Sequence, residues 1–362
     1  MPQGDSRQNP RQNPRRATIH DVARKAGVST ATVSKVMRGI ATVKPANADR
    51  VREAVAALDY RIDPLASGLR GENRRIIGAI VPDLESPFFG ALVTGLERAA
   101  EESGYHMIVA SSRESEAREA DLVARMNDWR VSGTILVPVR SERGPGARQL
   151  KALGMQAVLV DRVSPDDRYD TVTADNYAAS AAVADLLIGA GHRHILLHGA
   201  TRNSEAMRMR IGGFEARAHA LDPTVRIDTR VTDDTREVQR QAISAYFDTH
   251  TGAARPSAVY SLSQHATLLV LCELRRRAVA IPDEIALVGF DDADWMQTTW
   301  PTITAVAQPV ATMAKAAVAV LLARVERRST SFPVSRLEPC RMILRESASA
   351  HHALSRRARR GG

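Results

Sequence analysis

Small, hydroxyl-bearing and basic side chains gather near the N-terminus, in the run TATVSKVMR at residues 30–38. Short side chains let a backbone approach base edges, hydroxyl groups can bond bases or phosphates, and lysine can reach guanine acceptors. The residues suited to base edges in a major groove are Thr30, Ala31 and Lys35. The residues suited to phosphates are Thr18, Ser29, Thr32, Ser34 and Arg38. The simpler alternative is a solvated helix face on which Lys35 is an ordinary surface charge.

Two short helices would position these side chains. Residues 18–26 repeat apolar side chains at helical spacing, and Gly27 can end that helix in the left-handed conformation. Ser29 suits the N-cap of the next helix, and a third helix is expected from about Pro45 to Leu58. Two helices joined by a tight turn are the pattern of a helix-turn-helix unit. We therefore expect residues 16–60 to form a helix-turn-helix DNA-binding domain.

Residues 61–75 are expected to form a short hinge helix and a linker. A helix of barely two turns containing Gly68 is marginal by itself, and it can become ordered when a partner helix and DNA are present. Ala66 and Leu69 would then face a minor groove, with Leu69 as an apolar wedge that kinks the duplex. A plain linker is the alternative.

Basic residues are concentrated at the two ends of the chain. Residues 1–75 hold 15 Lys and Arg against 7 Asp and Glu, and residues 351–362 add four Arg. The totals of 50 basic and 41 acidic residues leave 31 against 34 for residues 76–350. A basic head on a near-neutral body is typical of a DNA-binding protein, whereas an ordinary basic protein would not separate its charge in this way. Residues 1–15 and 349–362 are expected to be basic tails, the first of them disordered.

Several function classes find no support in the composition. The two cysteines, Cys272 and Cys340, have neither a disulfide framework nor the spacing of metal ligands, and Cys272 is expected in the core. No segment has the pattern of a secretion signal or of a membrane span, so we expect a cytoplasmic protein with no membrane partner. No nucleophile elbow or phosphate-binding loop is present. We therefore expect no catalytic residue, no metal and no cofactor.

From Ile76 onward, apolar runs alternate with amphipathic helical patterns. Examples are IIGAIV at residues 76–81, GTILV at 133–137 and IALV at 285–288. This alternation is typical of parallel sheets with helices on both faces, so the expected fold class is an all-α head followed by one or two α/β subdomains.

Polar side chains follow several of these runs. The residues just past the strand ends are Pro82-Asp83, Asp161-Arg162, Asp175-Asn176, Ser261 to His265 and Gly289 to Asp292. Ligands of such sheets lie beyond the carboxyl ends of the strands, where clustered carboxylates suit the capture of a polar molecule. One Asp after a strand is more often a helix cap or turn residue, so the indication comes from several of them together.

Residues 16–70 resemble the DNA-binding head of the LacI/GalR family of bacterial repressors. The shared motifs are ATI at residues 17–19, DVA at 21–23, AGVST at 26–30, TVS at 32–34 and LR at 69–70. The resemblance implies that Thr30, Ala31 and Lys35 face the major groove and that Leu69 enters the minor groove. Lys35 stands where many members carry Arg, and Lys44 replaces the serine that usually caps the following helix.

The resemblance continues to about residue 348 and implies a body like that of periplasmic sugar-binding proteins. Its motifs include VDR at residues 160–162, RIGGF at 210–214, VGFDD at 288–292, QP at 308–309 and RES at 345–347. Such a body has two doubly wound parallel-sheet subdomains around a cleft, expected at residues 76–175 plus 306–335 and 176–305 plus 336–348. The residues that the resemblance places at the cleft are Phe88, Asp161, Asp175, Arg210, Leu262 and Asp291. Leu262 stands where the family commonly carries Asn.

The resemblance implies a sequence-specific DNA-binding transcriptional regulator that acts as a repressor. It would bind a pseudo-palindromic operator in double-stranded DNA as a homodimer. A small polar effector, a sugar or a related metabolite, would bind in the cleft and alter operator affinity. A solute-binding protein is one alternative, but a basic head does not favour it. An enzyme that uses Asp291 and Asp292 as an acid/base pair is another, and no catalytic motif supports it.

Overall fold

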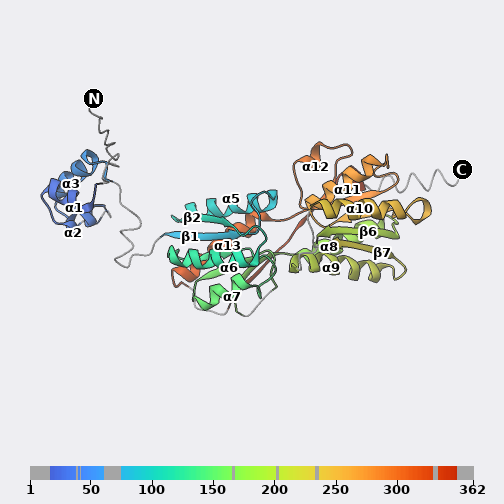
Figure 1. Ribbon diagram of the computed structural model, residues 1–362, viewed down its shortest axis with the longest axis horizontal. Helices are drawn as coiled ribbons and strands as arrows, with labels where there is room; N and C mark the ends of the chain where they lie inside the picture. Colours follow the sequence, from blue (N-terminus) through green and yellow to red (C-terminus); the bar gives the residue numbers. More distant parts are fainter. Residues whose placement is uncertain are drawn as a thin grey trace, which may run out of the picture. The chain divides into compact units, whose positions relative to one another are not determined.

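The chain folds as two units, Met1–Arg74 and Arg75–Gly362 (Figure 1). The computed structural model describes residues 17–37, 40, 42–60, 75–164, 168–200, 204–232, 236–328 and 333–348. The expected tails at 1–15 and 349–362 lie outside these ranges, as do hinge residues 61–74 with Ala66 and Leu69. Arg38, expected at a phosphate, also lies outside them.

The described part of the first unit contains three helices, α1 (Ile19–Ala26), α2 (Thr30–Met37) and α3 (Pro45–Ala57). Their core is small, and it is centred on the fully buried side chains of Val22, Val33 and Val51. Gly27 ends α1 with a φ of 64°, a conformation that glycine adopts without a steric penalty. The predicted helix-turn-helix arrangement is therefore present.

The helices of this unit begin with different caps. A capping box opens α1, because Thr18 accepts from the Asp21 backbone N–H while the Asp21 carboxylate accepts from the Thr18 N–H at 2.9 Å. Ser29 Oγ accepts from the Thr32 backbone N–H at 3.2 Å at the start of α2. Lys44 precedes α3 and makes no side-chain cap, so this helix lacks the stabilisation that a serine would supply.

The second unit is built on two sheets. The first is parallel throughout, in the order β11 (Ser335–Glu338), β5 (Asp170–Ala174), β4 (Ala157–Val160), β3 (Thr134–Leu136), β1 (Ile76–Val81) and β2 (His106–Ser111). The second has the order β12 (Arg341–Ile343), β10 (Thr304–Ala307), β9 (Ala286–Phe290), β8 (Ala258–Ser261), β6 (His194–Ala200) and β7 (Arg226–Thr232). Its strands are parallel except at the pair of β10 and β12.

Each sheet lies between two layers of helices (Figure 1). The first sheet packs against α5 (Pro87–Glu102) and α13 (Val310–Val325) on one face, and α6 (Glu116–Asp128) and α7 (Pro145–Ala152) on the other. The second packs against α8 (Asn176–Gly189) and α9 (Glu205–Leu221) on one face, and α10 (Arg236–Thr249) and α11 (Gln264–Arg276) on the other. A short helix, α12 (Trp295–Thr298), follows β9. Central strands are buried on both faces, which is why their sequences are apolar without alternation.

The chain passes between the two subdomains three times, and two of the passages fall later than predicted. The first follows β5, as expected. Strand β10 lies wholly in the second sheet and β11 wholly in the first, so the later passages fall at residues 308–309 and 339–340. The approximate boundaries predicted at 306 and 336 fall a few residues before these passages, and the exposed sequence SRLE of β11 carries no apolar strand pattern that would mark the last one.

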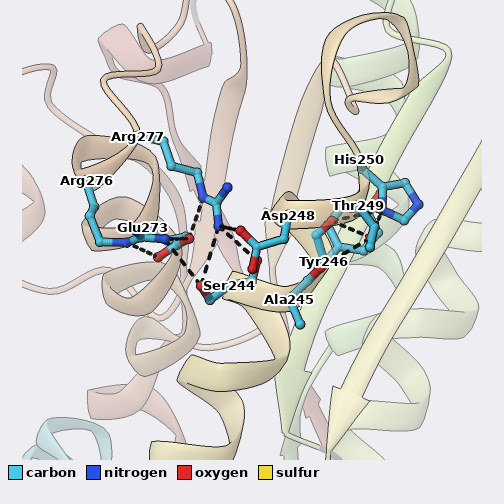
Figure 2. Close-up of polar contacts among 9 residues, drawn as sticks. All are labelled: Ser244, Ala245, Tyr246, Asp248, Thr249, His250, Glu273, Arg276 and Arg277. Carbon is cyan, nitrogen blue, oxygen red and sulfur yellow. Dashed lines mark hydrogen bonds and ion pairs between the residues drawn. The ribbon is translucent and has the colours of Figure 1, made fainter.

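An ion pair and a hydrogen bond from Arg277, at the end of α11, hold α10 against α11 in the second subdomain (Figure 2). Glu273 accepts from Arg276 and Arg277, and these hydrogen bonds, that from Arg276 foremost, lower the pKa of Glu273 to about 2. Arg277 also donates to the Ser244 carbonyl at 3.0 Å and to Asp248 at 2.6 Å on α10. The pair of helices is thereby fixed as one layer over the sheet.

Cys272 is exposed on α11, so the expectation that it lies in the core is wrong. Its neighbours Leu271 and Glu273 are buried instead, because the helix turns that face toward the sheet.

None of the helices within the described ranges has the length and apolar character needed to cross a membrane.

Close packing of α8 on α9 depends on Gly213. A Cβ at this position would lie 2.3 Å from the carbonyl oxygen of Tyr177, whereas one at Gly212 would meet nothing within 4 Å. We expect Gly213→Ala to reduce stability by about 1–3 kcal/mol through overpacking. Gly212→Ala, the matched control, should raise it by up to about 1 kcal/mol through helix propensity. Thermal unfolding of both variants measures this, and equal effects would contradict the packing argument.

Glu119 is a fully buried carboxylate on α6 that accepts from the backbone N–H groups of Val139 (2.5 Å) and Gly146 (3.1 Å). Burial raises the pKa of Glu119 to about 7. The folded chain therefore binds the Glu119 carboxyl proton more tightly than the unfolded chain does. The stabilisation that this proton gives the folded state is complete below pH 4.5 and is lost as pH rises through 7.

We therefore expect the stability of the wild type relative to Glu119→Gln to fall between pH 5 and pH 8, by on the order of 3 kcal/mol. Melting temperatures of the two proteins at a series of pH values measure the difference. A difference that does not vary with pH would show that Glu119 does not change its protonation state in this range.

Candidate functional site

Helix α2 presents a polar surface opposite its buried residue Val33. Ala31 and Lys35, one turn apart, are exposed, while Thr30 and Ser34 beside them are half-buried. Thr18 and Ser29 are also exposed, and both additionally serve in helix caps. The predicted base-contact residues therefore share an accessible helix face, and their contacts with DNA stay predictions.

A cavity of about 460 Å³ lies in the second unit, with walls from both subdomains. The first subdomain contributes Phe88 and Asp161, and the second contributes Arg210 and Asp291. Four of the six residues predicted at the cleft therefore lie on one cavity. Its volume is within the range of ordinary small-molecule sites.

Asp161 and Asp291 occupy matching positions in the two subdomains. Asp161 directly follows β4 and has a φ of 70°, while Asp291 directly follows β9 and has a φ of 68°. Each donates its backbone N–H to a neighbouring strand, Asp161 to Val172 and Asp291 to Val306. The left-handed backbone is uncommon for residues other than glycine, and such strain often marks a functional position. Here it ends each strand with a carboxylate beside the cavity.

Arg210 is the buried cation of this cavity. It is 5% exposed, and its Nε donates to Asn176 Oδ1 at 2.8 Å while Nη1 donates to the Leu262 carbonyl at 2.7 Å. Its Cζ lies 3.6 Å from the centroid of the Phe290 ring, and its Nη1 lies 3.9 Å from Asp291 Oδ2. These contacts fix the planar guanidinium in one orientation at the cavity wall.

Two buried acceptor oxygens at this site have no hydrogen-bond partner. They are Asp161 Oδ1 and Gln308 Oε1, while the amide nitrogen of Gln308 donates to Asp291 at 2.5 Å. Burial raises the pKa of Asp161 against the opposing effect of the Arg210 and Arg162 guanidinium groups. Unpaired buried acceptors are costly, so these oxygens would be stabilised by a ligand that donates hydrogen bonds.

Asp175 and Leu262 do not line the cavity, and these two predictions are corrected. Asp175 caps α8, because its carboxylate accepts from the Ala178 backbone N–H at 3.0 Å. Leu262 is fully buried among apolar side chains, and only its carbonyl takes part, as an acceptor for Arg210. A leucine side chain is stabilised in the core, so the backbone oxygen supplies the polar contact instead.

Arg162 and His265, which the sequence places just past strand ends, also line the cavity, together with Gln239, Trp295 and Gln308, which were not predicted. Arg162 directly follows Asp161 and pairs with Glu114 through two hydrogen bonds of 2.8 and 3.0 Å. Gln308 directly follows β10, and this strand-end position is a signal that could have identified it. Gln239 lies in the first turn of α10, and only the packing of this helix brings it to the cavity.

No group of three or more His, Cys, Asp or Glu able to hold a metal occurs in the part of the chain that the structure describes. Asp292 is bound by Arg345 through hydrogen bonds of 2.6 and 2.9 Å, so it points its carboxylate at a structural partner. The arrangement around Arg210 and Asp291 is suited to binding a polar molecule through donors and acceptors.

Two family descriptions match the chain. Residues 18–63 match the lacI family of bacterial regulatory proteins, and residues 184–348 match a periplasmic binding protein-like domain. The regulator PtxS of Pseudomonas aeruginosa is 32% identical over 328 residues, covering 88% of this chain and 93% of PtxS. The regulator KdgR of Bacillus subtilis is 28% identical over 337 residues, covering 91% of this chain and 97% of KdgR. Both relatives are named as helix-turn-helix transcriptional regulators.

Solved structures share the fold. A Lac repressor dimer bound to operator and the anti-inducer ONPF has a TM-score of 0.80 at 22% identity, covering 92% of this chain and 99% of the repressor chain. A complex of the regulator CelR with cellobiose has a TM-score of 0.67 at 24% identity, covering 92% of this chain and 100% of the other. The helix-turn-helix unit, the two-subdomain body and the identity with PtxS all point to one family. The chain belongs to the LacI family of bacterial DNA-binding transcriptional regulators.

Proposed function

We propose that this regulator represses transcription as a homodimer on a pseudo-palindromic operator, and that a neutral, hydroxyl-rich effector in the cavity changes its operator affinity. The observation that carries the effector proposal is the group formed by Arg210, Asp291 and the unpaired oxygens of Asp161 and Gln308. Hydroxyl groups both donate and accept, so a sugar ring could satisfy a guanidinium and several carboxylate or amide oxygens together.

Charge favours a neutral effector over an acidic one. The acidic residues on the cavity wall are Asp83, Glu85, Glu114, Asp161 and Asp291. Arg162 and Arg210 are the arginines there, and Arg162 is already paired with Glu114. An anion would meet an excess of like charge, whereas a polyol could donate to the carboxylates. Phe88 adds an apolar surface against which the face of a sugar ring could pack.

The cavity also supports coupling between effector and operator. Phe88 and Asp161 belong to one subdomain and Arg210 and Asp291 to the other, so a molecule contacting both groups favours one relative arrangement of the subdomains. A ligand with different affinities for two arrangements shifts their populations. The arrangement of the subdomains would change how two hinge segments pair in the dimer, and operator affinity would change with that pairing. The cavity would bind its effector without catalysing a reaction on it.

The first test concerns base reading by α2. Lys35→Ala should weaken binding to the palindromic site near this regulator's own gene by about 1–3 kcal/mol, since a lysine on a base edge would be lost. Arg52→Ala removes a cation that is 69% exposed on α3, and it serves as the control with little expected change. Gel-shift titration at fixed salt measures both. Equal losses on specific and random DNA would assign Lys35 to phosphate contact only.

The second test concerns the effector site. Full-length protein is titrated calorimetrically with a panel of pentoses, hexoses, D-xylulose and cellobiose, the last two being molecules present in solved structures of the same fold. Asp291→Asn preserves the shape and tolerates a left-handed backbone, but it replaces one charged acceptor with a donor. We expect it to lower the affinity for the best-binding sugar by about 10- to 100-fold.

Asp292→Asn is the matched control for this substitution. It makes the same chemical change at the next residue, whose carboxylate is bound by Arg345 outside the cavity lining. Sugar affinity should therefore stay within about twofold of the wild type, although stability falls because the Arg345 pair is weakened. Binding of a panel sugar that Asp291→Asn leaves unchanged would contradict the proposed site.

A further inference from the structure

A second group of buried polar side chains lies beside the cavity in the second subdomain. His198 on β6 and Ser261 on β8 are register partners of a parallel pair, so their side chains project from the same face of the sheet. This is the face covered by α10 and α11, because Leu196 and Val259 on it pack with residues of those helices. Both His198 and Ser261 are 0% exposed.

One nitrogen of His198 has a defined role and the other does not. The Nδ1 atom lies 3.1 Å from the Arg230 carbonyl oxygen, which can only accept, so Nδ1 carries the proton. Burial lowers the pKa of His198 to about 4, so the ring is neutral near pH 7 and Nε2 is an acceptor. Neither Nε2 nor the Ser261 hydroxyl has a hydrogen-bond partner, although both atoms are buried.

This polar pair adjoins the cavity described above. Ala200 lines that cavity, and His198 lies two residues earlier on the same strand face, about 7 Å deeper by strand geometry. His265 lines the cavity from the first turn of α11, and it is near enough to His198 to act on it electrostatically. Gln239 lines the cavity from the first turn of α10. The pair therefore lies behind a wall that the effector would touch.

We propose that His198 and Ser261 form a hydroxyl-binding subsite, in which one hydroxyl of the effector donates to His198 Nε2 and accepts from Ser261 Oγ. This proposal rests on the proposed function, since the same molecule would occupy the cavity and extend an arm past His265 and Gln239. A hydroxyl satisfies both groups at once, because it carries one donor and two acceptor positions. A cation would lose its hydration beside two neutral groups and gain no counter-charge.

The subsite would determine specificity. A sugar without the matching hydroxyl would leave the buried Nε2 atom unpaired and would bind more weakly for that reason. A sugar with the hydroxyl would pair an acceptor and a donor that otherwise remain buried and unsatisfied. Arg210 and Asp291 would then hold the ring, while His198 and Ser261 select one hydroxyl of it.

The test is a double-mutant cycle between protein and ligand. Wild-type protein and Ser261→Ala are titrated calorimetrically with the best-binding sugar of the panel and with its series of monodeoxy derivatives. We expect one deoxy derivative to bind the wild type about tenfold more weakly, since one buried hydrogen-bonded group is lost. Ser261→Ala should bind the parent sugar more weakly than the wild type by a similar factor. Removing the matching hydroxyl from the sugar should then weaken its binding to Ser261→Ala little further, because both changes remove the same contact.

Ser257→Ala provides the matched control. Ser257 lies just before the amino end of β8, beside another histidine, His192, with which it shares a hydrogen bond of 3.0 Å. Ser257→Ala also removes a serine hydroxyl, but just before the opposite end of the strand. Its affinities for the parent sugar and for each deoxy derivative should therefore match those of the wild type.

Three results are distinguishable. Strong coupling of Ser261 to one hydroxyl supports the subsite. Independent effects at every hydroxyl overturn it, and they would mean that the buried pair holds an ordered water or nothing. Failure of every panel sugar to bind the wild type rejects the hydroxyl-rich effector itself and this subsite with it, whereas additivity with intact sugar binding rejects the subsite alone.

Discussion

The buried guanidinium of Arg210 is the interaction on which the geometry of the cavity depends. A charge that is 5% exposed requires compensation, and it receives this from Asn176, the Leu262 carbonyl, the Phe290 ring and the nearby Asp291 carboxylate. These partners come from three helix or strand ends of the second subdomain. Loss of any one of these partners leaves a polar group buried beside an apolar core. The contacts that orient the Arg210 guanidinium therefore also fix the packing of α8, β8 and β9.

The first subdomain supplies the opposite wall by the same structural device. Asp161 and Asp291 each follow a central parallel strand, adopt a left-handed backbone and donate their N–H to the adjoining strand. Carboxyl ends of parallel strands meet at one edge of a sheet, which is where such folds bind ligands. Because each subdomain offers only one side of the cavity, the proposed effector would contact both, and this would link its binding to the relative arrangement of the subdomains.

Residues with local signals were predictable. Apolar runs identified the buried strands β1, β3 and β9, and Gly27 with Ser29 identified the turn between α1 and α2. The half-exposed edge strand β7 and the exposed strand β11 lack such runs, because edge positions need no apolar side chain on both faces. Asp175 and Leu262 were misplaced since a residue type shows what a side chain can do, while packing decides where it points.

The sequence by itself determined the basic helix-turn-helix head and the alternating α/β body, because periodicity, glycine at a turn and charge segregation are local properties of the chain. The four cavity residues Phe88, Asp161, Arg210 and Asp291 were implied by the family resemblance. Only the tertiary structure decided which carboxylates share the cavity and which cap helices or pair with arginine. It also brought Gln308 and His198 to the region of Ser261 and His265. His198, Ser261 and Gln308 are distant in sequence, and strand order and helix packing, which no local pattern records, make them neighbours.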